Sequence, residues 1–379
     1  MDLNLTVYRL CEENKKLREF LISKGYDNLK DDKNYKLMGR MIKLSQALKM
    51  KSIDKNQFIE EYNNFLNGYV ELFENKKDSK YMVAGAVPCP IKVPLFDLLN
   101  EFNKKNNIED IDYDFRTANL GMEFLNEFLK GEGPSLVTSA GYDLIINRDS
   151  YNRLIKDYHA PDISYDDSIL KRIPNIKDPN DKFFIMSMVP AVFIINKKVL
   201  GDRDYPKTWE ELLFDDRYNN SLTIPKGDLD LFNAIVISIY SKYKEEGLIN
   251  LKKKVISDLH PSQMVNTKNL GSSYISLAPY FFATLIRTDD LITVWPEDGA
   301  IVSPIFINVK NGEDDNIKSA LDYFLSKEVI DTFSNNGKFP ITIKSLAEDD
   351  NKPYFFSDWE ILNNLDSHLD MICKYFDIR

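Results

Sequence analysis

From Tyr81 onward, short apolar runs alternate with longer amphipathic runs along the chain. Residues 81–87, 111–117 and 135–138 are typical of strands, and residues 94–103 and 122–129 place apolar side chains at helical spacing. Strands that alternate with helices of about 10–15 residues form βαβ units around a parallel sheet. The alternation therefore predicts an α/β fold.

A second alternating block begins at residue 183. Its expected strands are 183–188, 191–196, 222–224, 291–295 and 301–309, and its expected helices are 208–214, 229–243, 247–259, 272–286 and 315–326. This order predicts that the chain leaves one lobe near 188–190 and returns near 295–300. Two such crossings predict a hinged pair of α/β lobes with a cleft between them.

The first 75 residues follow a different pattern. Apolar residues recur at steps of three and four over residues 4–73, which predicts helices, and a charged run at 75–80 follows. We therefore predict three parts: a helical domain at 1–75, a first lobe made of 81–189 and 296–379, and a second lobe at 190–295.

Composition excludes several classes of protein. The 379 residues carry a net charge of −10, and no long basic run is present, so binding to nucleic acid is not expected. The three cysteines, Cys11, Cys89 and Cys373, form neither a disulfide framework nor a CxxC metal site. The three histidines lie far apart in sequence, which argues against a zinc site.

The amino terminus lacks the features of an export signal. Charged residues interrupt its apolar residues, no lipobox surrounds Cys11, and no stretch approaches the roughly 18 apolar residues of a membrane span. We therefore expect a cytoplasmic location, with export only by an unrecognised route.

Three turns that follow expected strands are candidates for ligand binding, because ligands of open α/β sheets bind beyond the carboxyl ends of strands. They are residues 85–90, 138–142 and 270–274. Small residues there let backbone amides approach a ligand, and helix N-termini favour anions or carboxylates. The alternative is that Ser139, Ser272 and Ser273 only cap helices.

Catalytic signatures are missing. The chain has no G-x-G-x-x-G turn, P-loop or G-x-S-x-G elbow, and we expect no cofactor. Cys89 is the one candidate nucleophile, although a small apolar side chain or a ligand-lining thiol fits its position between Pro88 and Pro90 as well.

Four segments carry a resemblance to a known family: PAVFIINKK at 190–198, PKTWEELL at 206–213, WPEDGA at 295–300 and NGKFP at 336–340. The chain from about residue 81 resembles the type II solute-binding proteins of ABC importers, in the branch that includes ferric-ion-binding proteins. The resemblance implies a periplasmic-binding-protein-like type II α/β fold. Its two α/β lobes and hinged cleft would follow a small all-α domain, and the lobes would close on a ligand.

The resemblance also implies a set of ligand-binding residues. The iron-binding members use an adjacent pair of tyrosines, whereas here Phe281 follows Tyr280, so the second phenol is absent and the metal stays unassigned. Tyr274 is an alternative phenol, and packing in the core is an equal alternative for both tyrosines. The expected ligand-binding residues are Val87, Pro88, Cys89, Ser139, Ala140, Gly141, Ser272, Ser273, Tyr274 and Tyr280.

The helical domain has a resemblance of its own. Its segments LMGR at 37–40 and ALKM at 47–50 resemble a small helical domain that accompanies redox and iron–sulfur-repair proteins. We expect non-catalytic binding of a small solute, such as a metal ion, an oxyanion or a small metabolite. The expected macromolecular partner is an ABC transporter permease, or a cytoplasmic protein that contacts the helical domain of a sensor or carrier. The alternative is a cytoplasmic enzyme that uses Cys89 in the interlobe cleft.

Overall fold

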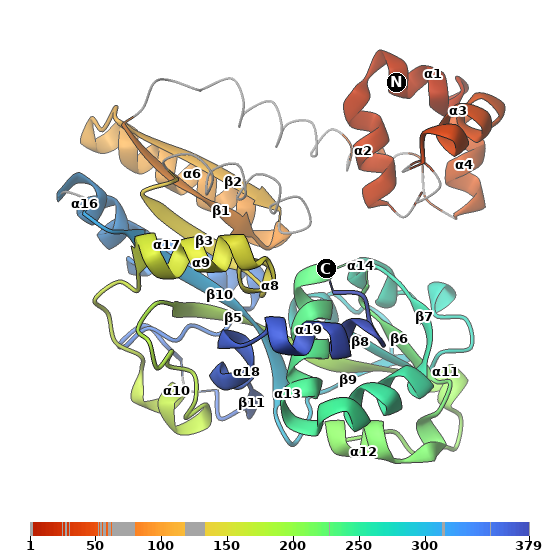
Figure 1. Ribbon diagram of the computed structural model, residues 1–379. Helices are drawn as coiled ribbons and strands as arrows, with labels where there is room; N and C mark the ends of the chain where they lie inside the picture. The colour runs from red at the N-terminus through yellow and green to blue at the C-terminus, as the bar shows by residue number, and fades with distance from the viewer. Residues whose placement is uncertain are drawn as a thin grey trace. The chain divides into compact units, whose positions relative to one another are not determined.

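A computed structural model divides the chain into two compact units, residues 1–77 and 78–379, and each is described here by itself (Figure 1). The structure describes residues 3–24, 26, 29, 31–51, 53, 55, 58, 59, 62, 80–117, 133–226, 228–312, 315–348 and 350–378.

The described part of the first unit is helical, as predicted. Its helices are α1 (Val7–Glu13), α2 (Lys15–Ser23), α3 (Asp32–Met41) and α4 (Leu44–Met50). The hydroxyl of Thr6 caps α1 by accepting a hydrogen bond from the Arg9 amide at 3.3 Å. Leu17, Leu21, Leu44 and Leu48 face a shared core, which explains the three- and four-residue spacing of the sequence. The expected helical pattern at 63–73 lies outside the described residues.

The second unit is built on a network of mixed strands with helices on both faces (Figure 1). In the described part of the chain the order is β2-β1-β3-β10-β5-β8-β6-β7, with β4 and β11 on β10 and β9 on β5. The strands are β1 (Tyr81–Val87), β2 (Ile111–Thr117), β3 (Leu136–Ala140), β4 (Tyr158–His159), β5 (Phe184–Asn196), β6 (Leu222–Ile224), β7 (Val255–Asp258), β8 (Ile275–Pro279), β9 (Leu291–Val294), β10 (Ala300–Lys310) and β11 (Tyr354–Phe355).

One strand, β5, belongs to both lobes. Its first half pairs with β10, where Pro190 lies opposite Val302, and its second half pairs with β8 and β9, where Ala191 lies opposite Pro279. Two separate strands were expected here, at 183–188 and 191–196. That expectation was wrong because Pro190 does not end the strand: it lies where the strand changes partners, and a missing N–H is tolerated there.

The helices differ from the sequence expectations at several ends. Helix α6 begins at Cys89 rather than at residue 94, because Pro90 lies in its first turn, where a helix needs no backbone N–H. The expected helix at 122–129 lies outside the described residues. The long helices of the unit are α6 (Cys89–Asn106), α9 (Arg148–Asp157), α13 (Leu229–Lys254), α16 (Asp315–Phe324), α17 (Lys327–Gly337) and α19 (Asp366–Cys373). The short helices are α8 (Asp143–Ile146), α10 (Asp167–Arg172), α11 (Lys197–Leu200), α12 (Trp209–Phe214), α14 (Pro261–Met264), α15 (Tyr280–Ala283) and α18 (Trp359–Asn363).

One expected helix of the second lobe was wrong, and another ends earlier than expected. Residues 272–286 form β8 and the short α15, because the buried apolar run at 275–279 fits a central strand as well as a helix. The expected helices at 229–243 and 247–259 correspond to the two parts of α13, which is interrupted at Lys244 (φ 54°). The second part ends at Lys254, and β7 follows it.

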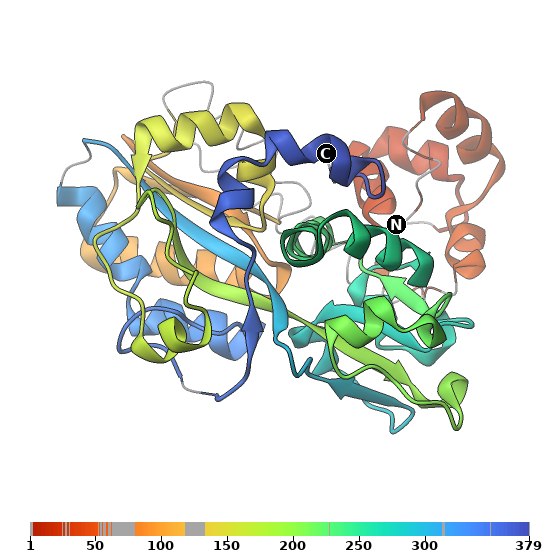
Figure 2. The same cartoon turned by 60° about the horizontal axis from the view of Figure 1, so that its bottom comes forward.

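The carboxyl-terminal tail, assigned from sequence to the first lobe, also packs on α13 (Figure 2). The ring of Phe376 lies 6.1 Å from that of Phe232, and the hydroxyl of Tyr240 lies 2.9 Å from Nδ1 of His368. A single apolar core therefore continues from the β1–β3 region through β5, β10 and α13 to the tail.

None of the helices in the described part of the chain combines the length and the apolar composition that a membrane span requires.

Candidate functional site

The ends of strands from both lobes meet where β5 and β10 pair. Ala140, the last residue of β3, lies opposite Ile305 of β10, and the Gly141 amide donates a hydrogen bond to the Pro304 carbonyl at 2.8 Å. Three residues before Ile305 on β10, Val302 pairs with Pro190, and the next residue of β5 pairs with the end of β8. The turns after β3 and β8 therefore flank the same crossing, as expected for a ligand site between two α/β lobes.

Six of the expected site residues lie together at this edge. Ala86 pairs with Ser139, so the turn after β1 lies beside the turn after β3. Cys89 is exposed at the start of α6, whereas Ser139 is only 1% exposed and its hydroxyl points to the neighbouring carbonyl of Ala140 at 3.4 Å. The six are Val87, Pro88, Cys89, Ser139, Ala140 and Gly141.

Three others lie at the opposite edge of the second lobe. Ser272, Ser273 and Tyr274 precede β8, and the Asn196 amide at the far end of β5 donates to the Tyr274 carbonyl. The Ser273 hydroxyl donates to the Ser221 carbonyl at 2.8 Å, and the Tyr274 hydroxyl donates to the Arg217 carbonyl at 3.2 Å. The structure therefore does not bring them together with Gly141. The expectation that they lead into a helix was wrong, because a strand follows.

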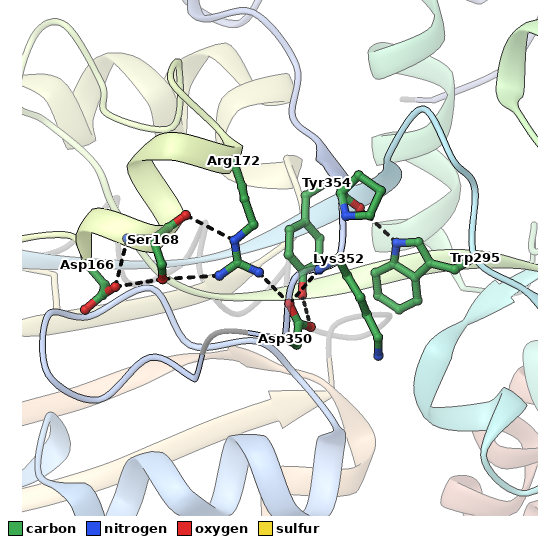
Figure 3. Close-up of polar contacts among 8 residues, drawn as sticks. Asp166, Ser168, Arg172, Trp295, Asp350, Lys352 and Tyr354 are labelled. Atoms are coloured by element: carbon green, nitrogen blue, oxygen red, sulfur yellow. Dashed lines mark hydrogen bonds and ion pairs between the residues drawn. The ribbon is translucent and has the colours of Figure 1, made fainter.

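Tyr280 belongs to an aromatic cluster at the hinge. It follows β8 directly, and its ring meets that of Trp295 edge-on at 5.3 Å. The ammonium nitrogen of Lys352 lies 4.6 Å from the centroid of the Tyr280 ring and 4.5 Å from that of Trp295. The indole N–H of Trp295 donates to the Pro353 carbonyl at 2.8 Å (Figure 3). The cation–π contacts and this hydrogen bond hold the segment that contains Lys352 and Pro353 to the second lobe.

The same segment also contacts the first lobe. Asp350 forms an ion pair with Arg172 at the end of α10, and it accepts a hydrogen bond from the Tyr354 hydroxyl at 2.6 Å (Figure 3). Burial, together with the neighbouring Asp350, raises the pKa of the Tyr354 phenol well above its usual range. We call residues 350–354 the hinge strap, because they tie α10 of the first lobe to Trp295 of the second.

The two lobes touch at Gly141. Its φ of +78° is a left-handed conformation that favours glycine, and an added Cβ would lie 2.8 Å from the Cβ of Asp230. Asp230 lies in the first turn of α13, which belongs to the second lobe. The absence of a side chain at residue 141 therefore allows the start of α13 to pack against the end of β3.

Three carboxylates surround this contact, and we call them the acidic cluster: Asp143, Asp228 and Asp230. Asp228 is the N-cap of α13, and Asp143 is the first residue of α8. Burial raises the pKa of Asp143 to about 6. Burial, together with the charge of Asp143, raises the pKa of Asp228 to about 6. Burial and both neighbouring carboxylates raise the pKa of Asp230.

Asn233 completes the polar groups at the acidic cluster. Its Nδ2 donates a hydrogen bond to Oδ1 of Asp143 at 3.0 Å across the lobes. Its Oδ1 and that of Asp230 are buried without a hydrogen-bond partner. Sequence reasoning missed these residues, because an Asp before an expected helix indicates an N-cap and nothing more. Their positions after β3 and β6 were the available signal.

A preformed metal site is absent from the part of the chain that the structure describes. No three His, Cys, Asp or Glu side chains there are placed to hold a metal ion.

Comparison with known proteins identifies the family. A family model described as bacterial extracellular solute-binding protein matches residues 132–365, which is more than half of the chain. The chain therefore belongs to this family of binding proteins, as the resemblance indicated. Residues 1–59 match a second family, described as a domain of unknown function, which accounts for the additional helical unit.

Solved structures show the same fold. A ferric binding protein from Campylobacter jejuni is 13% identical, with a TM-score of 0.57 over 78% of this chain and 99% of that one. Iron-bound HitA from Pseudomonas aeruginosa is 12% identical, with a TM-score of 0.57 over 78% and 99%. An ABC transporter protein from Clostridium perfringens ATCC 13124 is 15% identical, with a TM-score of 0.54 over 79% and 100%. These likenesses confirm the predicted type II fold. No curated protein matches the chain.

Proposed function

We propose that residues 78–379 capture a small solute between the two lobes, and that the lobes close on it. The observation that carries this proposal is the contact of Gly141 with Asp230 beside the crossing of β5 and β10. It lies at the carboxyl ends of strands from both lobes, where α/β sheets bind ligands. The family of solute-binding proteins supports the same function.

A solute screen tests this proposal. A solute that binds only the folded protein raises the free energy of unfolding by RT ln(1 + [L]/Kd), so thermal shift detects it without knowledge of its identity. Small-angle scattering of the full-length protein should then show a smaller radius of gyration with the solute bound. A bound solute that leaves the scattering profile unchanged would contradict lobe closure.

The solute is delivered to an ABC transporter permease in this proposal, in keeping with the family and with the fold shared with an ABC transporter protein. The alternative is an intracellular sensor or carrier that reports through residues 1–77. The cytoplasmic location stays a prediction, and fractionation of cells that produce the native protein tests it. Cross-linking in those cells separates a permease from a cytoplasmic partner.

One observation favours the second candidate, an enzyme that uses Cys89. The thiol is exposed at the first residue of the long helix α6, beside Lys92, and both positive charge and a helix N-terminus favour a thiolate. Burial lowers the pKa of Lys92. Turnover of any substrate that disappears in Cys89→Ser would establish the enzyme. On the binding proposal, the same change leaves no activity to lose.

A further inference from the structure

We propose that the helical unit binds the surface of a membrane that contains anionic lipids, through one exposed face of α3. This face is formed by Lys33, Lys36, Leu37, Arg40 and Met41, and we call it the basic–apolar face. The proposal concerns residues 1–77 and not the capture of a solute by residues 78–379, so the two are tested separately.

Positive charge is concentrated in this part of a chain that is acidic overall. Residues 33–51 contain six Lys and Arg and no Asp or Glu, whereas the whole chain has a net charge of −10. The segment forms α3, α4 and their connection, and its cationic side chains are all exposed. The segment therefore presents to solvent a positive charge that the composition of the chain does not explain.

The same segment exposes large apolar side chains. Leu37 is 62% exposed, and Met41 and Met50 are each 76% exposed. Together with Met38 they are four of the eleven exposed large apolar side chains of the described residues, and all four lie within 14 consecutive residues. Exposed apolar side chains that gather in one region mark a surface that binds a partner or a membrane.

Helical spacing places charged and apolar side chains on the same face of α3. Members of the basic–apolar face follow the steps i, i+3, i+4, i+7 and i+8, which share one side of an α-helix. Tyr35 and Gly39 lie on the other side, against α1 (Figure 1). The Tyr35 ring lies 5.1 Å from that of Tyr8, and a Cβ added at Gly39 would lie 3.3 Å from the Cβ of Tyr8. The basic–apolar face is therefore directed away from the core of the unit.

An anionic bilayer supplies both kinds of contact that this face requires. Leu37 and Met41 would enter the boundary between headgroups and acyl chains, while the lysine stems carry their ammonium groups to the lipid phosphates. A nucleic acid would neutralise the charges but leave the apolar side chains in water, because none of the exposed large apolar side chains of α3 is an aromatic ring for stacking. An acidic protein would need a groove matched to Leu37 and Met41, which a bilayer does not.

Sedimentation of the full-length protein with vesicles tests the proposal. One set of vesicles contains phosphatidylcholine alone, and the other contains about 30 mol% phosphatidylglycerol, which is anionic. We expect binding to the anionic vesicles only. Raising the salt concentration from about 0.05 M to about 0.5 M should weaken that binding at least about tenfold, because salt screens the attraction between lysines and lipids.

Two double variants separate the contributions of charge and of apolar contact. Lys33→Gln with Lys36→Gln removes two charges, each of which changes the partition about fivefold, so binding to anionic vesicles should weaken roughly 25-fold. Leu37→Ser with Met41→Ser should weaken it at least about tenfold at both salt concentrations, because no apolar side chain then enters the bilayer. All four positions are exposed, so neither variant is expected to change Tm.

A matched control lies in the other unit. Lys104→Gln with Lys105→Gln removes two exposed charges from the last turn of α6 and should leave vesicle binding unchanged. Equal losses in this control and in the Lys33 and Lys36 variant would overturn the assignment to α3, and so would equal binding to both kinds of vesicle.

The remaining outcomes identify a different occupant or none. Fluorescence anisotropy with labelled polyglutamate and with labelled double-stranded DNA is measured on the same proteins. If either probe binds and the vesicles do not, and the double variants of α3 lose that binding, the face belongs to an acidic protein or to a nucleic acid and the membrane proposal is wrong. If neither probe nor vesicle binds, the proposal is also wrong, while solute capture by residues 78–379 is unaffected.

Discussion

Replacing Gly141 by alanine tests the contact between the lobes. An alanine at φ +78° costs roughly 1–2 kcal/mol in the folded state. About 0.4–1 kcal/mol of this is offset because alanine restricts the unfolded chain. The backbone alone therefore predicts a loss of about 1 kcal/mol in the free energy of unfolding.

Packing adds a second cost at Gly141. The new Cβ would lie 2.8 Å from Cβ and 3.0 Å from Cα of Asp230, so the start of α13 must move, because no flexible side-chain end is available to give way. Overpacking of this kind costs about 1–3 kcal/mol. We therefore expect Gly141→Ala to lose roughly 2–4 kcal/mol in total.

Gly312 provides a matched control. Its φ of +82° is nearly the same, but nothing lies within 4 Å of an added Cβ. Gly312→Ala should therefore lose only the backbone cost of about 1 kcal/mol. Urea denaturation followed by tryptophan fluorescence measures both, since Trp209, Trp295 and Trp359 all lie in the larger unit. Equal losses in the two variants would refute the contact between Gly141 and α13.

Three further predictions address the pKa values, the hinge strap and the helical unit. Because the pKa of Asp143 is about 6 when folded and 3.8 when unfolded, its contribution to stability is present below pH 3.8 and lost as pH rises through 6. Urea denaturation should show the ligand-free protein gaining about 1.4 kcal/mol from pH 7.5 to pH 5 through this group, and Asp143→Asn should lack that gain. Lys352→Met should lower the free energy of unfolding by about 1 kcal/mol because two cation–π contacts are lost, whereas the exposed Lys344→Met should not; equal effects would contradict the strap. A chain that begins at residue 79 should be soluble and unfold cooperatively, because 1–77 and 78–379 each form a compact unit; aggregation on size exclusion would show a shared core.

Strands with clear boundaries were predictable from sequence. The runs at 81–87, 111–117 and 222–224 match β1, β2 and β6, because charged or turn-forming residues bound each apolar run. β8 was missed because Ile275 to Pro279 is buried on both faces and has no alternation to distinguish it from a helix. Its misassignment also placed Ser272 and Tyr274 at the wrong edge of the sheet.

The site was only half predictable for a related reason. The turn after β3 was found because Gly141 and its neighbours carry a recognisable small-residue pattern. Asp228 and Asp230 look like ordinary helix-capping residues until the fold places them against the other lobe. Their pKa values are raised because the first lobe, nearly 90 residues away in sequence, helps to bury them. The local sequence pattern around Asp228 and Asp230 cannot reveal that contact.

Because β5 continues from one lobe into the other, the hinge is a hydrogen-bonded ribbon and not a loose connector. All 13 residues of β5 are buried, so bending must twist a packed strand against β10. Pro190 donates no hydrogen bond at the point where the strand changes sheets, which makes that point the softest of the ribbon. The proposed movement of the lobes would therefore require this buried, hydrogen-bonded strand to bend. A cut at Pro190 would sever the strand that joins the lobes, while each half of β5 kept its own partners, β10 on one side and β8 and β9 on the other.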